Sequence, residues 1–201
     1  MQKPSYSVYR ARPFGHFRIE KSAAINKEDA MSNLKYTVPP PIEAVDQGVA
    51  DLCWLAATTV VYSWKDGRRW TMTDAANRLG VEFIAHQAAG SALSYNELAL
   101  WRSRGPFGMQ HQQCIAADGW DALLRAHGPL ITLVDGSGAS EINHAVVVYG
   151  IEGDGGARTT FLSVANGQGG VLERWSLNDF VSIFEIGPGN DRCLVCSTLN
   201  S

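Results

Sequence analysis

The spacing of apolar residues changes from a helical to a strand-like period near Gly128-Pro129. Before these residues, apolar side chains recur every three or four positions, which predicts helices. After them, short runs rich in β-branched residues alternate with turns of Gly, Ser and Asp, which predicts strands. Helices first and strands second indicate an α+β fold, in which a helical half packs against an antiparallel sheet.

Four helices are predicted in the first part of the chain, each from polar residues that can cap its N-terminus. The first helix has so few polar residues that we expect it to be buried in the centre of the fold. The predicted caps are Asp51, Thr71 with Asp74, Ser94 with Glu97, and Asp118 with Asp121. The predicted strands are residues 130–134, 145–151, 159–164, 171–175 and 193–196.

The three consecutive prolines at residues 39–41 exclude a helix and favour an extended segment. We therefore expect residues 1–38 to form an N-terminal basic arm and residues 39–201 to form the folded domain. The first 40 residues carry seven basic against three acidic groups, and the remaining residues carry 10 basic against 17 acidic groups. An acidic body argues against nucleic acid as the main partner, because phosphate binding needs clustered Lys and Arg.

Composition excludes several other classes of protein. A hydrophobic content of 45% provides a packed core and excludes an intrinsically disordered chain. No apolar stretch is long enough to predict a membrane span. The first 30 residues lack the apolar core of a secretory signal, which predicts synthesis in the cytoplasm without Sec export. Four cysteines are too few for a disulfide scaffold in a chain of this length.

Cys53 stands near the start of the predicted buried helix. A helix N-terminus presents unpaired N–H groups and the positive end of the helix dipole, so we expect it to lower the pKa of the Cys53 thiol. Because the thiolate is the reactive form of cysteine, Cys53 is a candidate nucleophile. Taken alone, a cysteine in an apolar helix is more often part of the core.

Two further residues are candidates for a role in chemistry. His144 opens an apolar strand, where it needs an anion or a hydrogen bond, because a charged imidazole is not buried without a partner. Asn166 follows a strand and precedes Gly167, a pair that by itself indicates only a turn.

Taken together, three segments resemble the papain-like cysteine peptidases, and they occur in the order found in that family. The resemblance covers about residues 39–186. The distance in sequence from the cysteine to the histidine is shorter than in the plant and lysosomal enzymes. It is more similar to that of bacterial effector proteases and double-glycine leader peptidases. The three segments are Gln47-x5-Cys53-Trp54-x-Ala56, Asn143-His144-Ala145-Val146 with Tyr149-Gly150, and Asn166-Gly167.

The resemblance implies a papain-like cysteine protease fold for residues 39–201, with a Cys-His-Asn catalytic triad. Cys53 would attack a carbonyl carbon as a thiolate paired with the imidazolium of His144, and Asn166 would orient the His144 ring. The Gln47 side-chain amide and the Cys53 backbone N–H would form the oxyanion hole. No cofactor and no metal ion is implied.

The chain departs from the family pattern on both sides of these motifs. Residues 51–52 are Asp-Leu where the family usually has Gly-Ser, and residues 167–169 are Gly-Gln-Gly where it usually has Ser-Trp-Gly. Because that tryptophan is missing, we expect the contact between Asn166 and His144 to be less shielded.

The resemblance leads us to expect a cysteine endopeptidase with a protein substrate. A small thiol protease without a Sec signal suggests a bacterial effector or antibacterial toxin delivered by a specialised secretion system. A toxin would require a cognate immunity protein that inhibits it in the producing cell. An alternative is an amidase, deamidase or acyltransferase toxin acting on protein side chains or peptidoglycan, since these reactions also begin with a thioester. A non-catalytic binding module is a third interpretation.

A zinc site is a weaker hypothesis. Two short motifs together offer four soft ligands of the kind that zinc binds. A buried terminal strand explains the second motif more simply, so we expect no metal site. The motifs are His111-x-x-Cys114 and Cys193-x-x-Cys196.

Overall fold

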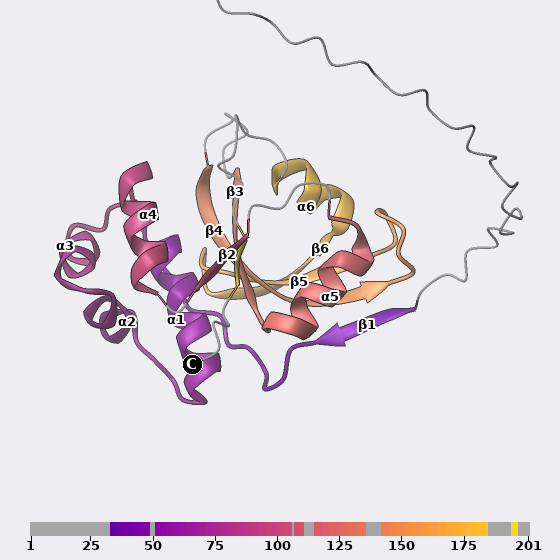
Figure 1. The fold of residues 1–201 in the computed structure, drawn as a ribbon, viewed down its shortest axis with the longest axis horizontal. Coiled ribbons are helices and arrows are strands. Elements are labelled where there is room, and N and C mark those ends of the chain that lie inside the picture. Colours follow the sequence, from indigo (N-terminus) through magenta and orange to yellow (C-terminus); the bar gives the residue numbers. More distant parts are fainter. Residues whose placement is uncertain are drawn as a thin grey trace, which may run out of the picture. The chain divides into compact units, whose positions relative to one another are not determined.

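The fold is an antiparallel sheet with helices packed on both of its faces (Figure 1). The computed structural model describes residues 33–48, 51–105, 107–110, 115–135, 142–184 and 194–196. These described residues belong to a single unit, Met31–Ser201. Residues 1–32 of the predicted arm lie outside the described residues, and the boundary at residue 38 stays a prediction.

The α+β class predicted from the change of apolar period is confirmed. Two short strands nevertheless precede Pro129, so the sheet also recruits segments from the first part of the chain. In the described residues, the helices are α1 (Cys53–Asp66), α2 (Met72–Leu79), α3 (Val81–Ala89), α4 (Tyr95–Arg104), α5 (Ala117–His127) and α6 (Leu177–Phe184). The strands are β1 (Leu34–Thr37), β2 (Gly108–Gln110), β3 (Leu130–Asp135), β4 (Ile142–Gly153), β5 (Phe161–Asn166), β6 (Val171–Ser176) and β7 (Leu194–Cys196).

The sheet has the strand order β2-β7-β3-β4-β5-β6, and every pairing is antiparallel. The long strand β4 pairs with β3 through residues 142–148 and with β1 through residues 150–153. These two ranges do not overlap, so β4 pairs with β3 along one part of its length and with β1 along another. The hairpin pairing of β4 with β5 brings Val146 opposite Asn166, which sets the position of the candidate residues on these strands.

Two of the four predicted helix caps are confirmed. Thr71 and Asp74 form a capping box at α2, and the Glu97 carboxylate accepts the Ser94 N–H at 2.7 Å at the start of α4. Gly80 is the C-cap of α2.

The other two caps are wrong. Asp51 does not cap α1: the N-cap position is Leu52, no side chain caps this helix, and the Asp51 N–H donates to the carbonyl of Gly90 at 3.2 Å. Asp118 lies inside the first turn of α5 rather than before it, because the extended backbone that precedes the helix is at Ala116. A carboxylate in the first turn still interacts favourably with the helix dipole.

Helices α3 and α6 were not predicted. Helix α3 follows α2 directly after Gly80 and ends at Gly90, whose φ of 63° is the left-handed conformation that closes helices. Helix α6 begins where the Ser176 hydroxyl accepts the Asp179 N–H at 3.1 Å. Both helices therefore carry recognisable end signals, but they are short and adjoin other elements.

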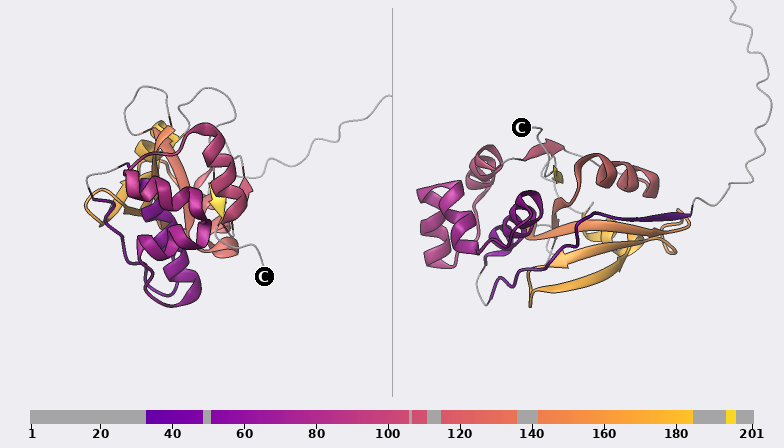
Figure 2. Two further views of the ribbon diagram at one scale, coloured as in Figure 1. Left: turned by 90° about the vertical axis from the view of Figure 1, so that its left-hand side faces the viewer. Right: turned by 90° about the horizontal axis from the view of Figure 1, so that it is seen from below.

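Helix α1 is buried along most of its length, as predicted. Every residue from Cys53 to Tyr62 is buried. On β4, side chains alternate between the two faces, so Ala145 and Val147 pack in the cluster with α1. The alternate residues of β4 pack in a second cluster with α5 and α6. Figure 2 shows the sheet between these helices from two further sides.

No helix in the described part of the chain has both the length and the apolar character needed to cross a bilayer.

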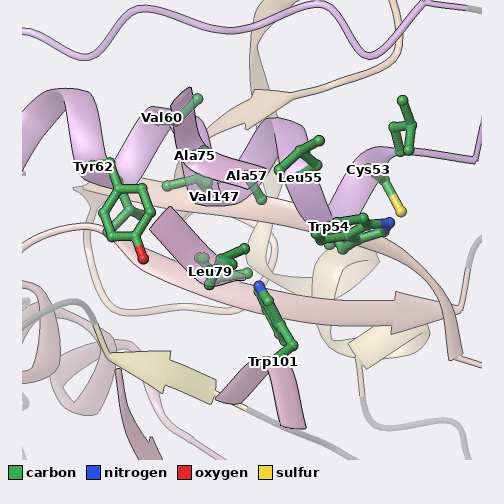
Figure 3. Packing of buried hydrophobic residues seen from close by; sticks show 14 of the residues in the cluster. Cys53, Trp54, Leu55, Ala57, Val60, Tyr62, Ala75, Leu79, Trp101 and Val147 are labelled. Atoms are coloured by element: carbon green, nitrogen blue, oxygen red, sulfur yellow. The ribbon is translucent and has the colours of Figure 1, made fainter. Parts of the chain in front are cut away.

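Trp101 connects α4 to α1. Its side chain is completely buried, and its Nε1–H donates to the hydroxyl of Thr58 at 2.9 Å. Thr58 in turn donates to the backbone carbonyl of Trp54 at 2.7 Å. Figure 3 shows Trp101 among the other buried residues around α1. This buried chain of hydrogen bonds sets α4 against the helix that begins with Cys53.

Replacing Trp101 by Phe is expected to lower the free energy of unfolding by about 2 kcal/mol more than replacing Trp120 by Phe. Both indoles are completely buried, so the two substitutions remove the same volume. The Trp120 Nε1–H has no acceptor among the described residues, so only Trp101→Phe breaks a hydrogen bond. Urea unfolding of both variants measures the difference, and equal losses would contradict the role given to this bond.

Candidate active site

Cys53 is the first residue of α1 and is 9% exposed. Cys53 and His144 are both among the residues that line one small pocket, of about 40 Å³. Figure 3 shows the Cys53 sulfur at the end of α1, beside Trp54. The helix, the sheet and the loop between α3 and α4 all contribute to this pocket. Its other lining residues are Trp54, Ala92, Leu93, Leu98, Leu133 and Ala145.

Burial raises the pKa of the Cys53 thiol above its ordinary value. Backbone hydrogen bonds from Ala145, Trp54 and Cys53 itself oppose this change, and the negative charge of Asp51 adds to it. The N–H groups at the helix N-terminus lower the pKa, as expected, but the loss of hydration outweighs them and the net change is upward. A thiolate at this position needs a positive partner.

His144 and Asn166 are brought together by the pairing of β4 with β5. Asn166 lies opposite Val146, and His144 is two residues before Val146, so both side chains lie on one face of the sheet. The His144 Nε2 and Asn166 Oδ1 atoms are 2.9 Å apart, within hydrogen-bond distance. Since this contact engages Nε2, the Nδ1 atom of the ring is the one available to a thiol.

Asn166 is held at both ends of its side-chain amide. It is 8% exposed, and Oδ1 also accepts the N–H of Gln168 at 3.0 Å. The Nδ2 group donates to Oε2 of Glu173 on β6 at 3.0 Å. The amide therefore has one orientation, with its oxygen towards His144. Glu173 was not among the predicted site residues, because only the pairing of β5 with β6 brings it to Asn166.

Gln47 lies beside the turn that follows Asn166. Its backbone N–H donates to the carbonyl of Gly167 at 2.8 Å. A Cβ atom added to Gly167 would lie 2.9 Å from Gln47 Oε1 and 3.2 Å from Ala56 Cβ in α1. The Gln47 segment, the Asn166 turn and the first turn of α1 therefore meet at Gly167, and a larger residue there would force the end of the Gln47 side chain to shift.

The loop between α3 and α4 forms one wall of the Cys53 pocket, and His86 holds it. The His86 ring bonds to the Ser91 hydroxyl through Nδ1 and to Glu97 through Nε2, each at 2.8 Å. Hydrogen bonds, first from Ser94 and then from His86, lower the pKa of Glu97 to about 2. The indole N–H of Trp54 donates to the Ser91 carbonyl at 3.2 Å. The wall is thus anchored to the residue after Cys53.

The described residues contain no group of three His, Cys, Asp or Glu side chains that could bind a metal ion. His111, Cys114 and Cys193 of the alternative zinc hypothesis lie outside the described residues. Cys196 is the last residue of β7.

The structure thus gathers the predicted residues at one end of the sheet. Cys53 and His144 share a pocket, His144 and Asn166 are in contact, and Gln47 is bonded to the turn after Asn166. A buried cysteine and a histidine that line one pocket, with one nitrogen of the histidine engaged by an asparagine, are an arrangement suited to nucleophilic chemistry.

The chain was compared with known proteins. A crystal structure of a double glycine motif protease from an AMS/PCAT transporter, in complex with the leader peptide, has 18% sequence identity and a TM-score of 0.44. The similarity covers 77% of this chain and 90% of that chain. No curated protein matches the chain.

A family model described as papain-like cysteine protease AvrRpt2 matches residues 32–185, well over half of the chain. This match confirms the resemblance, the papain-like fold and the prediction of a cysteine protease. The protein is therefore an enzyme that acts on a protein substrate. The chain belongs to the AvrRpt2 family of papain-like cysteine proteases.

Proposed function

We propose that the protein is an endopeptidase that uses Cys53, His144 and Asn166 as its catalytic triad. The observation that carries this proposal is the 2.9 Å contact between His144 Nε2 and Asn166 Oδ1, made by a histidine that shares a pocket with Cys53. Burial raises the pKa of the Cys53 thiol, so a protonated His144 is needed to stabilise the thiolate.

In the first half of the reaction, the Cys53 thiolate attacks the carbonyl carbon of the scissile amide, and the carbonyl oxygen becomes an oxyanion. His144 then donates its proton to the leaving nitrogen, the C–N bond breaks, and a thioester remains on Cys53. Asn166 keeps the ring in the orientation in which Nδ1 faces the thiol, because Nε2–H donates to its Oδ1.

In the second half, a water molecule replaces the departed amine. The neutral His144 takes a proton from this water, whose oxygen attacks the thioester carbon. The C–S bond breaks, the carboxylic acid product leaves, and the pair of Cys53 thiolate and His144 imidazolium is restored.

The Gln47 side-chain amide and the Cys53 backbone N–H donate to the oxyanion in this proposal. Two observations support a position of Gln47 at the site: its N–H bonds to Gly167, and Gly167 approaches the first turn of α1. In comparable sites, each oxyanion donor contributes about 3 kcal/mol to the stabilisation of the transition state.

Replacing Gly167 by Ala is expected to lower kcat by about 10-fold to 100-fold, because the new methyl group displaces Gln47 Oε1 and presses on Ala56. The matched control is Gly67→Ala at the opposite end of α1. Gly67 has a φ of 60° and open space around it, so this variant is strained but distant from Cys53. We expect Gly67→Ala to lower stability and leave kcat unchanged. Full activity of Gly167→Ala would contradict the placement of Gln47.

We further propose that the protease is a bacterial effector or antibacterial toxin, made in the cytoplasm and delivered by a specialised secretion system. The compact spacing of the cysteine, histidine and asparagine motifs supports this, since it resembles that of bacterial effector proteases. A producing cell would then contain an immunity protein that blocks the pocket. Harmless expression of the wild-type protein in both the cytoplasm and the periplasm of a bacterium would contradict the toxin proposal.

The experiment that tests the peptidase is a mass-spectrometric survey of new protein N-termini in bacterial lysate. Lysate is treated with the wild-type protein or with Cys53→Ala. A few sites that only the wild type produces would support the endopeptidase and give the residues around the cut. If no site is produced although Cys53 is reactive, the endopeptidase proposal fails and amide chemistry that leaves chains intact replaces it.

A further inference from the structure

A carboxylate stands directly behind Asn166. Oε2 of Glu173 accepts the Asn166 Nδ2–H at 3.0 Å and the indole N–H of Trp175 at 2.8 Å. The contacts therefore run in one line, from the imidazole of His144 through the amide of Asn166 to a negative charge.

The pairing of β5 with β6 explains this position. Val164 lies opposite Glu173, and Asn166 lies opposite Val171, so Asn166 and Glu173 are diagonal neighbours on one face of the sheet. Trp175 is two residues beyond Glu173 on the same face, which brings its indole to the same oxygen. Asn166 on β5 and Glu173 and Trp175 on β6 thus lie on one face of the sheet, and their hydrogen bonds fix the position of the carboxylate.

Within the described residues, no ion pair neutralises Glu173. The adjacent Arg174, on the opposite face of β6, pairs instead with Glu152 at 3.2 Å. The two neutral donors that reach Glu173 orient its carboxylate, but they leave its charge in place. Among the residues that the structure describes, no cation therefore pairs with that charge and cancels its electrostatic effect on Asn166.

A carboxylate at this position has two physical consequences. It only accepts hydrogen bonds, so it selects the amide orientation in which Nδ2 faces Glu173 and Oδ1 faces His144. It also polarises the amide, which makes Oδ1 a better acceptor for the Nε2–H of a protonated ring. Both effects favour the imidazolium of His144 and hence the thiolate of Cys53.

We propose that Glu173 is a positioning residue, whose charge acts on His144 through the neutral amide of Asn166. This inference rests on the proposed triad. In this arrangement, the triad gains the electrostatic effect of a carboxylate without direct contact between the carboxylate and the histidine. Trp175 holds the carboxylate in place.

The first test measures alkylation of Cys53 by iodoacetamide at about pH 6, where a thiol without a charged partner is mostly protonated. Glu173→Gln keeps an acceptor oxygen and removes the charge. We expect it to slow alkylation by about 10-fold, the effect of losing one charge-assisted bond. Glu152→Gln is the matched control, because the Glu152 carboxylate pairs with the exposed Arg174 side chain on the opposite face of the sheet, and it should leave the rate unchanged.

The second test separates positioning from a structural role. Asn166→Asp puts a second carboxylate against Glu173, and two like charges at this distance oppose each other. This repulsion protonates or displaces the new carboxylate, which would otherwise favour the imidazolium of His144 directly. Adding Glu173→Gln to Asn166→Asp supplies an amide donor for the new carboxylate, so it should raise the rate. Glu173→Gln would then slow the alkylation of Cys53 in the wild type and accelerate it in Asn166→Asp.

These outcomes distinguish the inference from the proposal beneath it. If Cys53 reacts equally fast in the wild type and in His144→Ala, the proposed triad fails. If His144→Ala is slow but Glu173→Gln matches the wild type, the triad stands and the inference is overturned. The inference is also overturned if Glu173→Gln slows alkylation by a similar factor in the wild type and in Asn166→Asp. Damage to folding would slow the reaction in both proteins, whereas the proposed charge effect slows it in one and accelerates it in the other. The melting temperatures of the variants check that they are folded.

Discussion

Cys53→Ala is expected to lower kcat by at least about 10⁴-fold, the scale found when a triad nucleophile is removed. Alanine has no atom that can form the thioester, so what remains is the rate enhancement from binding and the oxyanion donors alone. The measurement is the cleavage rate of a peptide that contains the site found in the lysate survey, compared with the wild type at equal concentration.

The fold should tolerate this substitution. The Cys53 side chain is buried at the end of α1 and loses only its sulfur, so we expect the variant to melt within a few degrees of the wild type. Cleavage by folded Cys53→Ala at a rate near that of the wild type would exclude Cys53 as the nucleophile. The same peptide with that variant serves as the blank for all other assays.

His144→Ala is expected to have an effect on kcat nearly as large, about 10⁴-fold or more, because the nucleophile and its base act as a unit. The variant should also slow the alkylation of Cys53 near pH 6. Burial raises the pKa of the Cys53 thiol, and none of the other described residues that line the pocket carries a positive charge to oppose this change. Single-turnover cleavage and alkylation rates measure the two effects.

Combining the two substitutions provides a stricter test. If Cys53 and His144 form one unit, the double variant should be no slower than either single variant. Multiplied effects would mean that the two residues act independently. His127→Ala at the end of α5 is the control for replacing a histidine, since α5 packs in the other core cluster. It should retain the kcat of the wild type.

The fold was predictable where local signals and apolar period agreed. The buried α1 follows from a run of residues with almost no polar side chain, and α2 and α4 follow from their capping boxes. Strands β1 and β2 were missed because each is short and depends on a distant partner, β4 or β7. Asp51 was misassigned as a cap because the Gly90 carbonyl, remote in sequence, takes its N–H.

The candidate site also contains residues that local motifs predict and features that only the tertiary structure shows. Cys53, His144 and Asn166 were predicted from short motifs, which are local in the sequence. Glu173 carries no motif, and its role depends on which β5 residue it stands beside. The net direction of the change in the pKa of the Cys53 thiol could not be predicted from the sequence, because burial is a tertiary property, whereas the helix N-terminus is a local one.

The burial of α1 also affects how the enzyme loses its activity. A helix whose first ten residues are all buried exchanges its amide hydrogens mainly when the whole domain opens. Cys53, the proposed nucleophile, is the first residue of this slowly exchanging helix. Local opening of the surface therefore leaves the cysteine in place, and the fraction of molecules with a rapidly alkylated Cys53 is a count of the molecules that are globally folded.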